Sequence, residues 1–112
     1  MRHFLVHTTV TPPQLDDDAM DALREQEIAR AQELQRAGVL VVLWRESGRL
    51  ASFGLWRGRD EGEVRDHLDT LPFRRYMSVE LTEVERHPNA LQPFPFDDAC
   101  PAPSIQDPRA GR

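Results

Sequence analysis

The sequence predicts an α+β fold in which two helices lie on one face of a four-stranded antiparallel sheet. Four stretches have the alternation or the short apolar run that is typical of strands, and two longer stretches have apolar residues at helical spacing. Along the chain they follow one another as strand, helix, strand, strand, helix, strand, which is the split βαβ order. The 112 residues suffice for one domain with a modest core.

The predicted strands differ in how they are patterned. Residues 3–10 and 75–84 alternate between apolar and polar side chains, which is typical of strands with one buried face. Residues 39–44 form an unbroken apolar run, which predicts a strand buried on both faces. Residues 50–56 return from a turn and contain Gly54, which predicts a bulge or a close approach by another group.

The two predicted helices have recognisable ends. The first begins at the acidic run 16–18, where carboxylates cap a helix and suit its dipole, and it ends at Gly38. The second spans about 61–71 and ends before Pro72. Its inward stripe contains Val64, His67, Leu68 and Leu71.

These elements in this order predict a ferredoxin-like βαββαβ fold. Two helices cannot cover both faces of four strands, so the uncovered face is expected to meet a second copy of the chain. The sequence therefore predicts a homo-oligomer of the dimeric α+β barrel type. The ferredoxin-like domain is expected to span residues 1–88. Residues 89–112 are expected to form a proline-rich C-terminal extension, since six of the nine prolines lie in residues 87–112.

Composition narrows the class of protein. The net charge of −5 argues against a nucleic-acid-binding surface, and the single cysteine, Cys100, excludes an internal disulfide framework. The longest apolar run, residues 39–44, is too short to span a membrane, and no signal peptide is recognisable. A soluble, cytoplasmic protein with no nucleic-acid or membrane partner is expected.

The first predicted helix carries a carboxylate where its pattern calls for an apolar residue. Glu27 falls within the inward stripe of that helix. An inward carboxylate either pairs with a cation, here Arg45 or another arginine, or has a raised pKa. A raised pKa suits proton transfer at neutral pH, so Glu27 is a structural ion-pair residue or a catalytic one. The other residues of the stripe are Met20, Leu23, Ala31 and Leu34.

Four further side chains are candidates for binding a substrate. Arg45 ends the apolar run and is either a solvated strand end or a guanidinium that grips a carboxylate. His67 on the second helix is a packing histidine or a site residue. Trp44 and Tyr76 are core or interface residues, or walls of a pocket. The four histidines and the cysteine lack metal-ligand spacing, so we expect a site without metal or cofactor.

With these residues in place, the chain resembles the muconolactone Δ-isomerase family. The resemblance runs from the first strand to about Asn89, and it depends on the order and spacing of several short motifs. These are Glu27 followed by the run Ala-Gln-Glu-Leu-Gln-Arg-Ala-Gly at 31–38, Leu43-Trp44-Arg45, Gly48, Leu71-Pro72-Phe73, Tyr76-Met77 and His87-Pro88.

The resemblance implies a cofactor-free enzyme of the catechol branch of aromatic degradation, the β-ketoadipate pathway. It implies an isomerase that shifts a double bond to turn muconolactone into the 3-oxoadipate enol-lactone, on a fold assembled through sheet-to-sheet dimers and often into decamers. Glu27 would remove a proton activated by the lactone carbonyl and return it two carbons away. Arg45 would hold the substrate carboxylate or the developing enolate charge.

The chain also departs from the family. Arg65 stands where the family usually has a histidine, and His67 lies about 200° away around the helix. Residues 39–42 lack the usual polar and aromatic side chains, and the tail is longer. The exact lactone therefore stays open. Two alternatives also stay open: a non-catalytic relative that binds a small acid, and a cofactor-free monooxygenase on the same fold.

Overall fold

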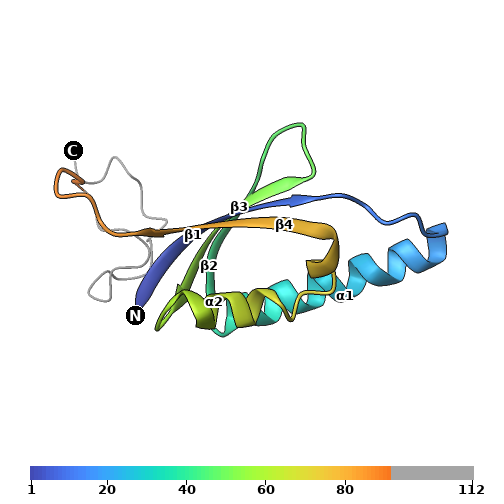
Figure 1. The fold of residues 1–112 in the computed structure, drawn as a ribbon, viewed down its shortest axis with the longest axis horizontal. Coiled ribbons are helices and arrows are strands. Elements are labelled where there is room, and N and C mark those ends of the chain that lie inside the picture. Colours follow the sequence, from blue (N-terminus) through green and yellow to red (C-terminus); the bar gives the residue numbers. More distant parts are fainter. Residues whose placement is uncertain (92–112) are drawn as a thin grey trace, which may run out of the picture.

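Four antiparallel strands form one sheet in the order β2-β3-β1-β4 (Figure 1). The computed structural model describes residues 1–91. The predicted βαββαβ order and ferredoxin-like fold are confirmed. The elements are β1 (Arg2–Val10), α1 (Asp17–Arg36), β2 (Leu40–Arg45), β3 (Ala51–Gly58), α2 (Glu61–Leu68), a short 3-10 helix (Arg74–Tyr76) and β4 (Met77–Val84).

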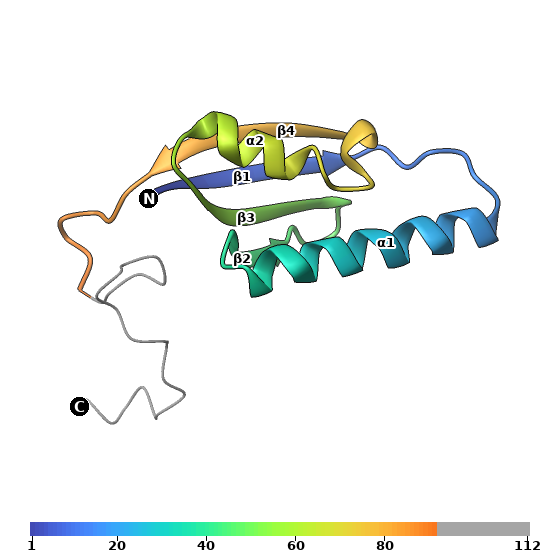
Figure 2. The same cartoon turned by 90° about the horizontal axis from the view of Figure 1, so that it is seen from below.

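Both helices lie on the same face of the sheet (Figure 2). The core lies between them and the strands, because alternate residues of each strand point toward the helices. Burying these apolar side chains supplies the main driving force for the fold. The buried core residues are Phe4, Val6, Leu34, Leu40, Trp56, Val64, Leu68 and Leu71.

Helix α1 begins and ends as the sequence predicts. The Asp16 side chain accepts the Ala19 N–H at 2.8 Å and caps the first turn. Gly38 has a φ of 75°, and the N–H groups of Gly38 and Val39 donate to carbonyls of the last turn at 3.0 Å. This is a Schellman ending, which requires the left-handed conformation that glycine adopts at little cost. The predicted inward stripe is confirmed, with Leu34 buried and its other members half-buried.

Three element boundaries differ from the prediction by two residues or more, and the first is the end of β3, at Gly58 rather than residue 56. Helix α2 ends at Leu68 rather than Leu71, because the Thr70 hydroxyl donates to the His67 carbonyl at 2.6 Å and closes the last turn. The next turns are tightened, with the Leu71 N–H bonded three residues back. Strand β4 begins at Met77 rather than residue 75, since the preceding three residues form the 3-10 helix.

The prediction that the second strand is buried on both faces is wrong for the single chain. Strand β2 lies at the edge of the sheet, and only Leu40 is buried. Leu43 is 45% exposed and Trp44 is 51% exposed. A bulge between Leu40 and Val42 leaves Val41 without a partner, so Trp44 points to the face opposite the helices.

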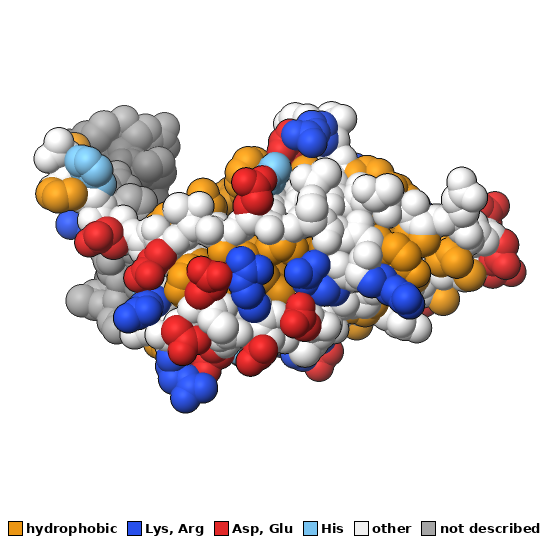
Figure 3. All heavy atoms as spheres, viewed as in Figure 1, with side chains coloured by type: hydrophobic (Ala, Val, Ile, Leu, Met, Phe, Trp, Pro, Cys, Tyr) orange, Lys and Arg blue, Asp and Glu red, His pale blue; other side chains and the backbone are white. Residues whose placement is uncertain are grey.

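The face shown in Figure 3 carries acidic and basic side chains that are interspersed over α2 and the neighbouring edge of the sheet. No helix within residues 1–91 is long and apolar enough to cross a membrane. The predicted proline-rich extension falls mostly on residues 92–112, which lie outside the described residues, and the predicted domain boundary at residue 88 stays a prediction.

Candidate functional site

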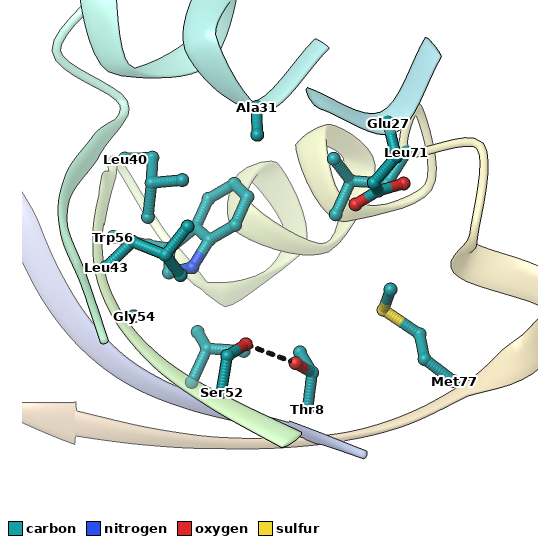
Figure 4. Close-up of a pocket in the computed structure, with 11 residues that line it drawn as sticks. Thr8, Glu27, Ala31, Leu40, Leu43, Ser52, Gly54, Trp56, Leu71 and Met77 are labelled. Atoms are coloured by element: carbon teal, nitrogen blue, oxygen red, sulfur yellow. Dashed lines mark hydrogen bonds between the residues drawn. The ribbon is translucent and has the colours of Figure 1, made fainter. Parts of the chain in front are cut away.

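Two adjoining pockets lie between α1 and the sheet, and Glu27 lines both. Figure 4 shows the inner of the two. The inner chamber has a volume of about 70 Å³, and the more open outer chamber has about 260 Å³. Because the two share four lining residues, they form one hollow that is open at one end. The shared residues are Thr8, Glu27, Ser52 and Met77.

The Glu27 carboxylate projects from the middle of α1 into this hollow (Figure 4). Its Oε1 accepts the Phe73 backbone N–H at 2.9 Å. Burial raises the pKa of Glu27 above its ordinary value near 4.5, and the Phe73 hydrogen bond lowers it by less. No ion pair involves Glu27 within residues 1–91, so the predicted pair with Arg45 or another arginine is not formed there. Of the two outcomes for an inward carboxylate, the structure shows the raised pKa.

The walls of the inner chamber are apolar and its floor is polar. Trp56 forms one wall and is only 3% exposed. On the floor, the Thr8 and Ser52 hydroxyl oxygens lie 2.6 Å apart, across paired positions of β1 and β3. One hydroxyl donates to the other, so one hydroxyl hydrogen is left for an acceptor within the chamber. The other apolar side chains that line it are Val6, Ala31, Leu40, Leu43, Leu71 and Met77.

Two arginines line the outer chamber. Arg45 comes from the end of β2, where the bulge turns its side chain to the helix face opposite Ser52. Arg24 comes from α1, one turn before Glu27, and its Nη1 lies 3.6 Å from an Asp21 oxygen. Two guanidinium groups beside one opening suit a ligand that carries a carboxylate.

The other predicted site residues lie outside the hollow in the single chain. Trp44 pairs with Phe53 on the opposite face of the sheet. Tyr76 lines a separate groove of about 420 Å³, and the Arg75 guanidinium lies 5.6 Å from its ring centre. His67 is half-buried on α2 and lines neither chamber. Roles of Trp44, Tyr76 and His67 in binding a substrate stay predictions.

Sequence reasoning missed several residues of the hollow. Thr8 and Ser52 carry no motif, and their meeting depends on strand register. The available signal was that Thr8 stands as a polar residue on the apolar side of β1. Arg24 gave no comparable signal, and Phe73 stood only in the motif Leu71-Pro72-Phe73, which did not indicate its contact with Glu27. Within residues 1–91, no three His, Cys, Asp or Glu side chains are grouped to hold a metal ion.

Known proteins resemble this chain in sequence and in fold. The family model for muconolactone delta-isomerase matches residues 2–90. Muconolactone Delta-isomerase 2 of Acinetobacter lwoffii is 34% identical over 89 residues, which are 79% of this chain and 93% of that protein. Muconolactone Delta-isomerase of Pseudomonas aeruginosa is 32% identical over 90 residues, 78% of this chain and 94% of that protein. A crystal structure of muconolactone isomerase matches with a TM-score of 0.73 and 30% identity, over 82% of this chain and 97% of that chain. The chain belongs to the muconolactone delta-isomerase family.

Proposed function

We propose that this protein is an isomerase that shifts the ring double bond of muconolactone or a close analogue, with Glu27 as the proton shuttle. The names of its relatives support the substrate class. The observation that carries the proposal is the half-buried Glu27 carboxylate at the junction of the two chambers, with a raised pKa and no cation partner among residues 1–91. A carboxylate in this state is a competent general base near neutral pH.

The reaction balances with this single group. Ionised Glu27 takes a proton from the saturated ring carbon that adjoins the C=C bond, and this bond is conjugated with the lactone carbonyl. The electron pair of the broken C–H bond enters the dienolate, and negative charge develops on the carbonyl oxygen. The protonated Glu27 then returns the proton two carbons away, which restores the carbonyl and leaves the double bond shifted. Neither an oxidant nor a reductant is consumed.

Binding of the substrate carboxylate is assigned to the outer chamber. Arg24 and Arg45 supply positive charge there, whereas the inner chamber has no cationic side chain. The lactone ring would then lie toward the inner chamber, beside Glu27. In this orientation the substrate carboxylate contacts the two arginines, and the lactone ring contacts the apolar walls of the inner chamber.

The test replaces Glu27 with glutamine, which keeps the size of the side chain and an oxygen that can accept the Phe73 N–H. The Glu27→Gln variant should isomerise muconolactone at least about 100-fold more slowly than the parent, followed by proton NMR. Glu25→Gln is the matched control, because Glu25 is exposed on the same helix and lines neither chamber. Turnover by Glu27→Gln near the parent rate would overturn the proposal. Binding of muconolactone to the parent without turnover would indicate a small-acid-binding relative instead.

A second copy of the chain is the proposed partner of the uncovered sheet face. That face carries Leu5, Phe53 and Trp44, and half of the Trp44 surface is exposed in the single chain. An aromatic side chain so exposed at a sheet edge is typical of an interface. A cytoplasmic location stays a prediction.

A further inference from the structure

The Trp56 side chain combines deep burial with an unused hydrogen-bond donor. It is 3% exposed and forms a wall of the inner chamber. No hydrogen bond among residues 1–91 involves its indole N–H, and this nitrogen is not among their fully buried unpaired atoms, so it is accessible from the inner chamber that Trp56 lines. An acceptor that arrives with a ligand would satisfy this group.

Gly54 makes the position of the indole possible. A Cβ atom at residue 54 would lie 2.7 Å from Trp56 Nε1, which is closer than real Cβ contacts come. The indole therefore folds back along β3 and lies over Gly54 (Figure 4). A side chain at this position would push the nitrogen away from the strand.

The indole N–H and the hydroxyl pair on the floor are close enough to serve one ligand. Ser52, Gly54 and Trp56 point to the same face of β3, and successive same-face residues are about 6.6 Å apart along a strand. Because the indole nitrogen lies over Gly54, it is about one such step from the Thr8–Ser52 pair. A ligand in the inner chamber can therefore reach both groups.

We propose that the Trp56 indole N–H donates a hydrogen bond to the lactone carbonyl oxygen of the substrate, with Gly54 clearing its place. The inference rests on the proposed function and adds the group that receives the developing charge. The inner chamber suits a neutral acceptor such as the carbonyl oxygen of the bound substrate, because Arg24 and Arg45 line only the outer chamber. As the dienolate forms, charge grows on that oxygen and the hydrogen bond strengthens, which favours the transition state over the substrate.

The experiment uses two ligands that cannot isomerise. One is the saturated lactone 5-oxotetrahydrofuran-2-acetic acid, and the other is tetrahydrofuran-2-acetic acid, which lacks only the carbonyl. Proton–nitrogen NMR of the full chain should show two indole signals, from Trp44 and Trp56, and Trp44→Phe assigns them. The lactone acid should move the Trp56 signal downfield, and the ether acid should not.

Affinities give a second measurement. The parent should bind the lactone acid about fivefold more tightly than the ether acid, and Trp56→Phe, which keeps an aromatic wall, should remove that preference. Gly54→Ala should remove it as well, since the indole is displaced. A Trp56 signal that moves equally with both acids, or a preference that survives in Trp56→Phe, overturns the inference alone. If neither acid binds and muconolactone is not isomerised, the proposed function fails with it.

Discussion

The Glu27 carboxylate accepts the Phe73 backbone N–H at 2.9 Å, across 46 positions of sequence. The bond joins the middle of α1 to the segment between α2 and β4. It holds Oε1 and leaves Oε2 without a partner among the described residues. One oxygen therefore fixes the orientation of the carboxylate while the other can exchange a proton with a ligand.

The raised pKa of Glu27 predicts the pH dependence of the reaction. The base must be ionised, so kcat/KM should rise with pH through a midpoint above 4.5. Rates should be measured with the methyl ester of muconolactone, whose own carboxylate does not titrate. A midpoint at or below 4.5 would contradict the assignment, because burial would then not dominate at Glu27.

The same pKa predicts a change in stability. The folded chain keeps the Glu27 proton to a higher pH than the unfolded chain does, so this group's contribution is greatest below about 4.5 and is lost as pH rises through the folded pKa. Glutamine does not ionise, so Glu27→Gln avoids the loss of stability that the parent undergoes at higher pH. The variant's melting temperature minus the parent's should therefore be larger at pH 7 than at pH 4. Equal differences at both pH values would show that the carboxylate is not penalised by burial.

Arg45 should act on binding rather than on the chemical step. Arg45→Met should raise KM for muconolactone about tenfold, with kcat little changed, because a charge-assisted contact at an exposed site is lost. The methyl ester should show similar KM values with the parent and the variant. Arg36→Met, in the exposed last turn of α1, is the control. A KM for muconolactone that stays unchanged in Arg45→Met would remove Arg45 from the site.

The Thr8–Ser52 hydroxyl pair should be measurable as an interaction energy. A double-mutant cycle with Thr8→Val and Ser52→Ala should give a coupling of about 1 kcal/mol in the free energy of unfolding, typical of a partly buried hydrogen bond. Urea titrations of the parent, both single variants and the double variant supply the four values. Additive effects of the two substitutions would mean that the pair contributes nothing to stability.

The proposed sheet-to-sheet association depends on Trp44. Trp44→Arg places a charge on the uncovered face and should lower the mass found by sedimentation equilibrium. Leu15→Arg is the control, since Leu15 is 43% exposed in the segment before α1. A parent that sediments as a single chain would refute the association.

The sequence was most informative where the spacing of apolar residues alone determines which side chains of an element face the core. The helical stripe placed Glu27 inward, and the structure confirms that position. The sequence could not predict the bulge at Val41. Residues 39–44 are all apolar, so no alternation shows which of them face the helices. The Thr8–Ser52 contact depends on strand register, which is set by tertiary structure.

The bulge at Val41 has a consequence for changes in chain length. The bulge accommodates one extra residue in β2, so a chain that lacks Val41 can still pair Arg45 with Ser52. Removal of Val41 would leave a regular strand with every later pair intact, whereas flattening the bulge with Val41 retained would bring Trp44 opposite Ser52. Homologues or engineered forms that lack this residue can thus keep Arg45 at the outer chamber. A shift of the strand by one residue would instead place the Trp44 indole there.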